Sequence, residues 1–241
     1  MEKDAIKAKN KKIQITRRIA QVVFLLLLVV GLYRDIRFVL IVLLPLCLIF
    51  GNFFCGWVCP FGTVQEYMSD LGMKIFKKKY KMPRNIQKYM QFLKYILGIS
   101  LLTGVTNFFI RQINGYRAFM HFPFDSITTV VATISLVIMI IYLLVSMLFE
   151  RPFCNYLCTE SPKYGILSMT RIYSIKRNED TCINCKLCDK ACPMNIEVSA
   201  HDHVRNGQCI NCFKCISACP VPGTLTYSRV KLPIGKKKEE K

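Results

Sequence analysis

Two stretches of the sequence carry the same cysteine pattern and decide the fold of the C-terminal part. Residues 182–193 read CINCKLCDKACP, and residues 209–220 read CINCFKCISACP. Each follows the pattern C-x2-C-x2-C-x3-C-P, in which three closely spaced thiolates on one tight loop can reach three corners of an iron–sulfur cubane. The fourth cysteine, on the following helical turn, points away from that loop and can serve a second cubane.

Crossed ligation of this kind assigns the eight cysteines to two [4Fe–4S] clusters. The first cluster is predicted to use Cys182, Cys185, Cys188 and Cys219. The second cluster is predicted to use Cys209, Cys212, Cys215 and Cys192. Zinc is the alternative, because C-x2-C pairs also bind zinc. Two matching runs of four cysteines favour iron–sulfur clusters over zinc.

The segment from Ile172 to Tyr227 resembles the bacterial ferredoxins that hold two [4Fe–4S] clusters. The resemblance rests on both complete motifs, each followed by a proline, Pro193 and Pro220. It implies a small α+β two-cluster ferredoxin-like domain over residues 172–230. Disulfides are not expected, because the orientation argued below places this domain in a reducing compartment.

Four apolar runs precede this domain, at residues 19–33, 38–54, 95–110 and 127–149. About 20 apolar residues cross a bilayer as a helix, and 52% of the 241 residues are hydrophobic. The sequence therefore predicts an all-α four-helix transmembrane domain over residues 19–171. It also predicts a multi-pass protein of the cell (inner) membrane, with membrane lipid as a partner.

The basic residues predict how this domain is oriented. Residues 1–18 and residues 62–88 hold seven Lys or Arg each, whereas the other two loops hold Arg34 and Arg37, and Arg111 and Arg117. Basic loops face the cytoplasm, so both termini and the ferredoxin domain are expected there. Residues 1–18 form a basic cytoplasmic N-terminus in this interpretation, and residues 231–241 a disordered basic tail. The net charge of +19 flanks the apolar runs, so no nucleic-acid partner is expected.

A second, shorter cysteine motif occurs twice near the ends of apolar runs. Cys55-Gly-Trp-Val-Cys59 and Cys154-Asn-Tyr-Leu-Cys158 align at an offset of 99 residues, which indicates an internal duplication. Residues i and i+4 of a helix share one face, so each pair can supply two ligands. We predict that Cys55, Cys59, Cys154 and Cys158 hold a third cluster, most simply [4Fe–4S]. The alternatives are that each pair meets a second copy of the protein, or binds nothing.

The combination of these motifs resembles the NapH-type family of membrane iron–sulfur proteins, which are polyferredoxin-like quinol dehydrogenase components. The first short motif, CGWVCP, matches the family pattern fully, and the second has Thr159 in place of the proline, which is not a ligand. The resemblance implies membrane helices, two C-x3-C motifs and a C-terminal ferredoxin domain.

Redox clusters beside a membrane domain suggest an electron-transfer subunit linking the quinone pool to a partner redox protein, such as a reductase, a flavoprotein or a ferredoxin. One alternative is a quinone-independent conduit from cytoplasmic ferredoxin or flavodoxin to an extracytoplasmic flavin or metal partner. Another is an accessory or assembly reductase. The sequence has no G-x-G-x-x-G fingerprint, P-loop or triad signature. No catalytic residue is therefore assigned, and the chain is interpreted as an electron carrier within an oxidoreductase complex.

Overall fold

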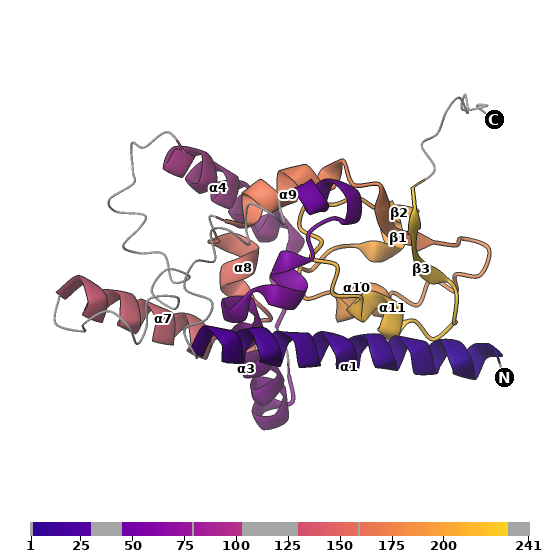
Figure 1. Ribbon diagram of the computed structural model, residues 1–241, viewed down its shortest axis with the longest axis horizontal. Coiled ribbons are helices and arrows are strands. Elements are labelled where there is room, and N and C mark those ends of the chain that lie inside the picture. The colour runs from indigo at the N-terminus through magenta and orange to yellow at the C-terminus, as the bar shows by residue number, and fades with distance from the viewer. Residues whose placement is uncertain (1, 30–44, 79, 103–129, 159, 231–241) are drawn as a thin grey trace.

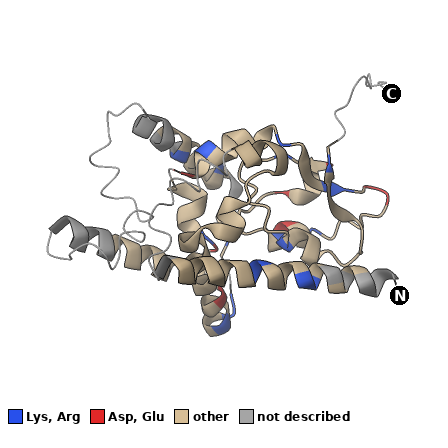
Figure 2. Ribbon diagram, in the orientation of Figure 1, with Lys and Arg blue, Asp and Glu red and all other residues tan. Residues whose placement is uncertain are grey.

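The computed structural model describes residues 2–29, 45–78, 80–102, 130–158 and 160–230. The longest helix, α1 (Glu2–Val29), runs along one side of the molecule (Figure 1). It lies against the π-helix η1 (Phe54–Val58), the helix α3 (Pro60–Phe76) and the short helix α11 (Lys214–Ala218). The charged side chains described on α1 are all basic (Figure 2). α1 therefore spans the boundary between the N-terminal helices and the C-terminal unit.

The remaining helices of the N-terminal part are α4 (Arg84–Leu102), α7 (Val130–Leu148), α8 (Pro152–Tyr156) and α9 (Ser161–Met169). α3 packs closely against α7. At their crossing, a Cβ atom on Gly72 would lie 1.9 Å from the carbonyl oxygen of Met147, so only glycine allows this approach. Helices α8 and α9 both contact α4. This arrangement brings the chain around residues 154–158 back beside residues 54–59.

The C-terminal unit contains a three-stranded antiparallel sheet with the order β2-β1-β3. Its strands are β1 (Tyr173–Arg177), β2 (His203–Val204) and β3 (Leu225–Arg229). The helix α10 (Leu187–Ala191) packs against α11, and the 3-10 helix η2 (Val198–Ala200) lies beside α10. The core that joins them contains Ile175, Met194, Ile196, Val204 and Leu225, all at most 5% exposed. These apolar side chains fix the two cysteine loops on one side of the sheet.

The prediction of a four-helix transmembrane domain over residues 19–171 is wrong. Of the helices in the described ranges, none combines the length and the apolar character that a membrane crossing requires. In the described residues, polar side chains or a break in the helix lie in or directly beside three of the four apolar runs, whereas the fourth run forms the uncharged helix α7. The described part of the first run belongs to α1, whose first half is polar, and this helix buries Arg17 and Gln21. The second run is interrupted by Gly51, which has a φ of +79°, and by a π-helix. Directly before the third run, α4, which begins at Arg84, buries Lys94.

The sequence also predicted a multi-pass location in the inner membrane, with both termini and the ferredoxin domain in the cytoplasm. That prediction depended on the four membrane helices and is wrong for the same reason. Parts of the predicted runs, at residues 30–44 and 103–129, lie outside the described residues. The same holds for Thr159, for the loop arginines 34, 37, 111 and 117, and for the tail at 231–241.

Candidate metal centres

The two cysteine loops of the C-terminal unit have matching backbone conformations. Asn184 (φ 51°) and Asn211 (φ 48°) occupy equivalent positions in the two motifs, and Lys186 (φ 55°) and Phe213 (φ 55°) do the same two residues later. Asparagine tolerates this left-handed region, whereas lysine and phenylalanine rarely enter it. Strained residues of this kind persist where the surrounding structure holds them, which is common at binding sites.

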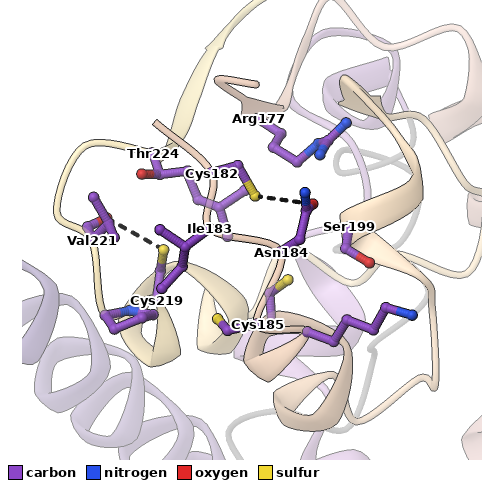
Figure 3. Close-up of a pocket in the computed structure, with 13 residues that line it drawn as sticks. Arg177, Cys182, Ile183, Asn184, Cys185, Ser199, Cys219, Val221 and Thr224 are labelled. Carbon is purple, nitrogen blue, oxygen red and sulfur yellow. Dashed lines mark hydrogen bonds between the residues drawn. The ribbon is translucent and has the colours of Figure 1, made fainter. Parts of the chain in front are cut away.

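The structure brings the eight cysteines together as two mixed sets. The first set surrounds a cavity that we call the outer site: Cys182, Cys185, Cys188 and Cys219 (Figure 3). The second set surrounds another cavity, the inner site: Cys192, Cys209, Cys212 and Cys215. Each cavity thus takes three cysteines from one motif and the last cysteine of the other. This is the grouping that the spacing predicts, and ligation itself remains a prediction.

The two sites differ in exposure to solvent. Cys185 of the outer site is exposed, and its other three cysteines are partly exposed. All four cysteines of the inner site are buried. Burial raises the pKa of Cys192 to about 12, and the neighbouring thiols of Cys212 and Cys209 contribute to the rise. A metal that binds such thiols displaces their protons, which are released to solvent.

The four cysteines of the short motifs also share one buried place, which we call the C-x3-C site. Cys59, Cys154 and Cys158 are buried, and Cys55 is partly buried. Burial raises the pKa of Cys158 to about 12, with further contributions from the thiols of Cys154 and Cys59. The pKa of Cys55 is likewise raised by burial and by Cys158 and Cys154. Each thiol therefore lies within the electrostatic reach of the others.

The duplication seen in the sequence appears again in the backbone of the C-x3-C site. The amide of Cys59 donates to the carbonyl of Phe54, and the amide of Cys158 donates to the carbonyl of Phe153, both at 2.9 Å. Each bond reaches five residues back, which is the wide turn of a π-helix and is frequent at functional sites. The motifs therefore end in equivalent turns rather than in the regular α-helix that the i, i+4 argument assumed.

Donors around the sulfur atoms fit an iron–sulfur cluster. The amide of Gly62 lies 3.5 Å from Cys59 Sγ, and Gln65 Nε2 lies 3.6 Å from Cys154 Sγ. At the inner site the amide of Ile196 lies 3.4 Å from Cys192 Sγ. Hydrogen bonds to sulfur tune the reduction potential of such clusters. Within the described ranges, no group of three or more His, Cys, Asp or Glu side chains is arranged to hold a single metal ion.

A buried ion network joins the C-x3-C site to the inner site, and sequence analysis missed it. Glu66, on α3, pairs with Arg151 Nη2 at 2.6 Å, with Arg17 Nη2 at 2.5 Å and with Lys214 Nζ at 3.0 Å. Arg151 Nη1 also donates to the carbonyl of Cys55 at 2.6 Å. The neighbouring cations hold the pKa of Glu66 well below its usual range despite its burial. The only sequence signal was that Glu66 is the first charged residue after Arg37.

Cysteine sets of this kind, on two loops beside a small sheet and on paired helix ends, define an iron–sulfur cluster protein. Residues 36–83 and 131–159 match the family described as a 4Fe-4S binding domain, and these ranges contain all four C-x3-C cysteines. Residues 174–220 match the family described as a 4Fe-4S dicluster domain.

Several curated proteins are similar to this chain. YccM of Escherichia coli is 30% identical over 203 residues, which cover 82% of this chain and 57% of YccM. The uncharacterized protein MJ0750 of Methanocaldococcus jannaschii is 31% identical over 210 residues, covering 78% of this chain and 85% of that protein. The ferredoxin-type protein NapH of Haemophilus influenzae is 26% identical over 144 residues, covering 58% and 47%. The chain belongs to the NapH-like family of iron–sulfur proteins. No solved structure matches it.

Proposed function

We propose that this protein carries electrons between a quinone and a partner redox protein, with one [4Fe–4S] cluster in each of its three cysteine sites. When bound, each cluster accepts and releases a single electron. The outer site would use Cys182, Cys185, Cys188 and Cys219 as ligands. The inner site would use Cys192, Cys209, Cys212 and Cys215, and the C-x3-C site Cys55, Cys59, Cys154 and Cys158. The names of relatives support electron transport, since YccM is named for it and NapH and MauN are named ferredoxin-type proteins.

The observation that carries the proposal is the direct packing of the C-x3-C site on the inner site. A Cβ atom on Gly56 would lie 2.2 Å from the carbonyl oxygen of Ile210, so the two cysteine-bearing segments touch through backbone atoms. Trp57 Nε1 donates to the carbonyl of Asn211 at 3.0 Å. Phe53 packs edge-on against Phe213, with ring centroids 5.7 Å apart. This joint holds the two sites in a fixed relation.

The difference in burial suggests the order of the sites. The C-x3-C site and the inner site lie inside the protein, whereas the outer site has the exposed Cys185. Ile183 and Leu187 beside it are 64% and 42% exposed. An exposed apolar patch beside a redox site is suited to transient docking of another protein. We therefore assign the partner redox protein to the outer site.

The quinone end of the proposal rests on an apolar cavity that precedes Cys55. The cavity has a volume of about 280 Å³ and is open on one side. It is lined by Leu46, Cys47, Phe50, Gly51, Phe53 and Phe54. Ligand pockets are mostly apolar clefts of this general size. A quinone ring held there would lie at the C-x3-C site rather than at the ferredoxin-like sites.

The number of clusters is tested by iron and acid-labile sulfide analysis of protein purified without oxygen. Three cubanes give about twelve irons per chain, because each [4Fe–4S] cluster has four ligands and four irons. A double variant, Cys55→Ser with Cys154→Ser, should retain about eight irons. Wild-type protein with about eight irons, unchanged in the double variant, would remove the third cluster from the proposal.

The electron donor is tested by adding a short-chain quinol to the oxidised protein without oxygen and recording EPR spectra. Quinol should produce signals of reduced clusters, and Leu46→Trp should weaken this response by narrowing the cavity. The matched control is Leu187→Trp, which adds the same side chain beside the outer site. Reduction by ferredoxin but not by quinol would instead support the quinone-independent conduit.

A further inference from the structure

Lys94, on α4, is a buried cation whose partners among the described residues are all neutral. Its side chain is completely shielded from solvent. Its Nζ atom donates to Ser161 Oγ at 3.4 Å and, in a shorter bond, to Gln208 Oε1. Among the described residues no carboxylate forms an ion pair with it, in contrast to Arg151, which pairs with Glu66. An ammonium group buried without a counter-charge is costly.

The surroundings of Lys94 point to the missing negative charge. Burial lowers the pKa of Lys94 to about 8. The thiols that face it raise this pKa, because a thiolate stabilises the charged ammonium group; they belong to Cys158, Cys55 and Cys154. Ser161, which Lys94 contacts, also donates its backbone amide toward Cys158. Gln208, the other contact, directly precedes Cys209 of the inner site. Lys94 therefore lies against the C-x3-C site, on the side facing the inner site.

We propose that Lys94 is the counter-charge of the cluster held by Cys55, Cys59, Cys154 and Cys158, and that it makes this cluster easier to reduce. The inference rests on the proposed third cluster. A cubane ligated by four thiolates carries net negative charge, and taking up one electron makes it one unit more negative. A fixed cation in a low-dielectric interior stabilises the reduced state more than the oxidised state. Lys94 acts as a positioning residue because it is not a ligand.

Three other cations lie near the C-x3-C and inner sites, and each of them shares the carboxylate of Glu66. Arg151 faces Cys55, Cys59 and Cys154, but its charge is paired with Glu66. Lys214 and Arg17 face Cys212 of the inner site and share the same carboxylate. Lys94 differs from these cations because no described carboxylate pairs with it, and the thiols that it faces all belong to the C-x3-C site.

The test is an EPR-monitored redox titration of the full chain with its clusters, comparing wild type with Lys94→Met. Methionine keeps a similar length and removes the charge. We expect the midpoint of the C-x3-C cluster to move to more negative potential, with the midpoints of the other two clusters changing less. Lys88→Met is the matched control, because Lys88 lies on the same helix and is exposed. Lys94→Arg, which keeps the charge, should restore the wild-type order of potentials.

Iron content separates failure of this inference from failure of the proposed function. About twelve irons with an unchanged midpoint in Lys94→Met would overturn the role of Lys94 and leave the third cluster standing. About eight irons in the wild type would overturn both. If Lys94→Met loses only the cluster of the C-x3-C site and Lys94→Arg keeps it, the result supports the inference that this cluster needs a positive charge at residue 94. Equal loss in both variants would show that the side chain serves packing, which overturns the inference.

Discussion

Cys219 belongs to the second sequence motif, yet its side chain lines the cavity of the first. It lies with Cys182 and Cys185 around the outer site. Burial is the main cause that raises the pKa of Cys219, and the thiols of Cys185 and Cys182 raise it further. Its own thiol contacts the carbonyl of Val221 at 3.3 Å (Figure 3). At the scale of single residues, this position distinguishes crossed ligation from ligation within one motif.

We expect Cys219→Ser to damage the cluster of the outer site and to spare that of the inner site. A hydroxyl is a poorer ligand for iron than a thiolate, so the outer cluster should be lost or converted. EPR of the reduced protein and iron analysis measure this, with about four irons fewer per chain expected. Cys47→Ser is the control, because Cys47 is buried but belongs to none of the three sets. Loss of the inner-site signal instead would contradict the crossed assignment.

At the scale of elements, the joint between the π-helix η1 and the second cysteine loop depends on glycine. Gly56 touches Ile210 so closely that any side chain must push the two segments apart. The only tryptophan of the sequence, Trp57, lies in this joint and is hydrogen-bonded across it. Its fluorescence therefore reports whether the C-terminal unit is docked on the C-x3-C site.

We expect Gly56→Ala to destabilise the protein by about 1–3 kcal/mol, the usual cost of overpacking. Tryptophan emission should also move to longer wavelength, because Trp57 becomes more exposed to water. Thermal unfolding and fluorescence measure the two effects. Gly72→Ala is the comparison, since it creates a similar clash with Met147 at the crossing of α3 and α7. It should lower stability without the same emission change, and an identical change in both variants would refute a local opening at the joint.

At the scale of the whole molecule, sequence reasoning reaches furthest where the information is local. Ligand spacing within twelve residues determines which cysteines share a loop, and the structure groups Cys192 and Cys219 across the two motifs as the spacing predicts. Hydropathy averages over a window and does not register a break such as Gly51, nor the burial of Arg17 and Lys94. These features, in or beside three of the four predicted membrane helices, could therefore not be foreseen from hydropathy.

The charge network could not be predicted because its members come from distant parts of the chain. Glu66 meets Arg17 and Arg151 across 49 and 85 residues, and Lys214 lies farther still. No local pattern links these positions, and only the folded arrangement of α1, α3 and α11 brings them together. The same limitation applies to Lys94, which looked in the sequence like a residue at the edge of an apolar run.

The contact between α1 and the second cysteine loop has a consequence for the order of assembly. Gln14 Nε2 donates to the carbonyl of Cys212 at 3.0 Å, and Asn10 Nδ2 donates to that of Ile216 at 3.4 Å, across 198 and 206 residues. Contacts so distant in sequence cannot form until the chain has been synthesised past Ile216, and they close slowly. α1 therefore covers the inner site only after the residues of that site have been synthesised. Iron and sulfide can reach its cysteines before α1 covers the loop.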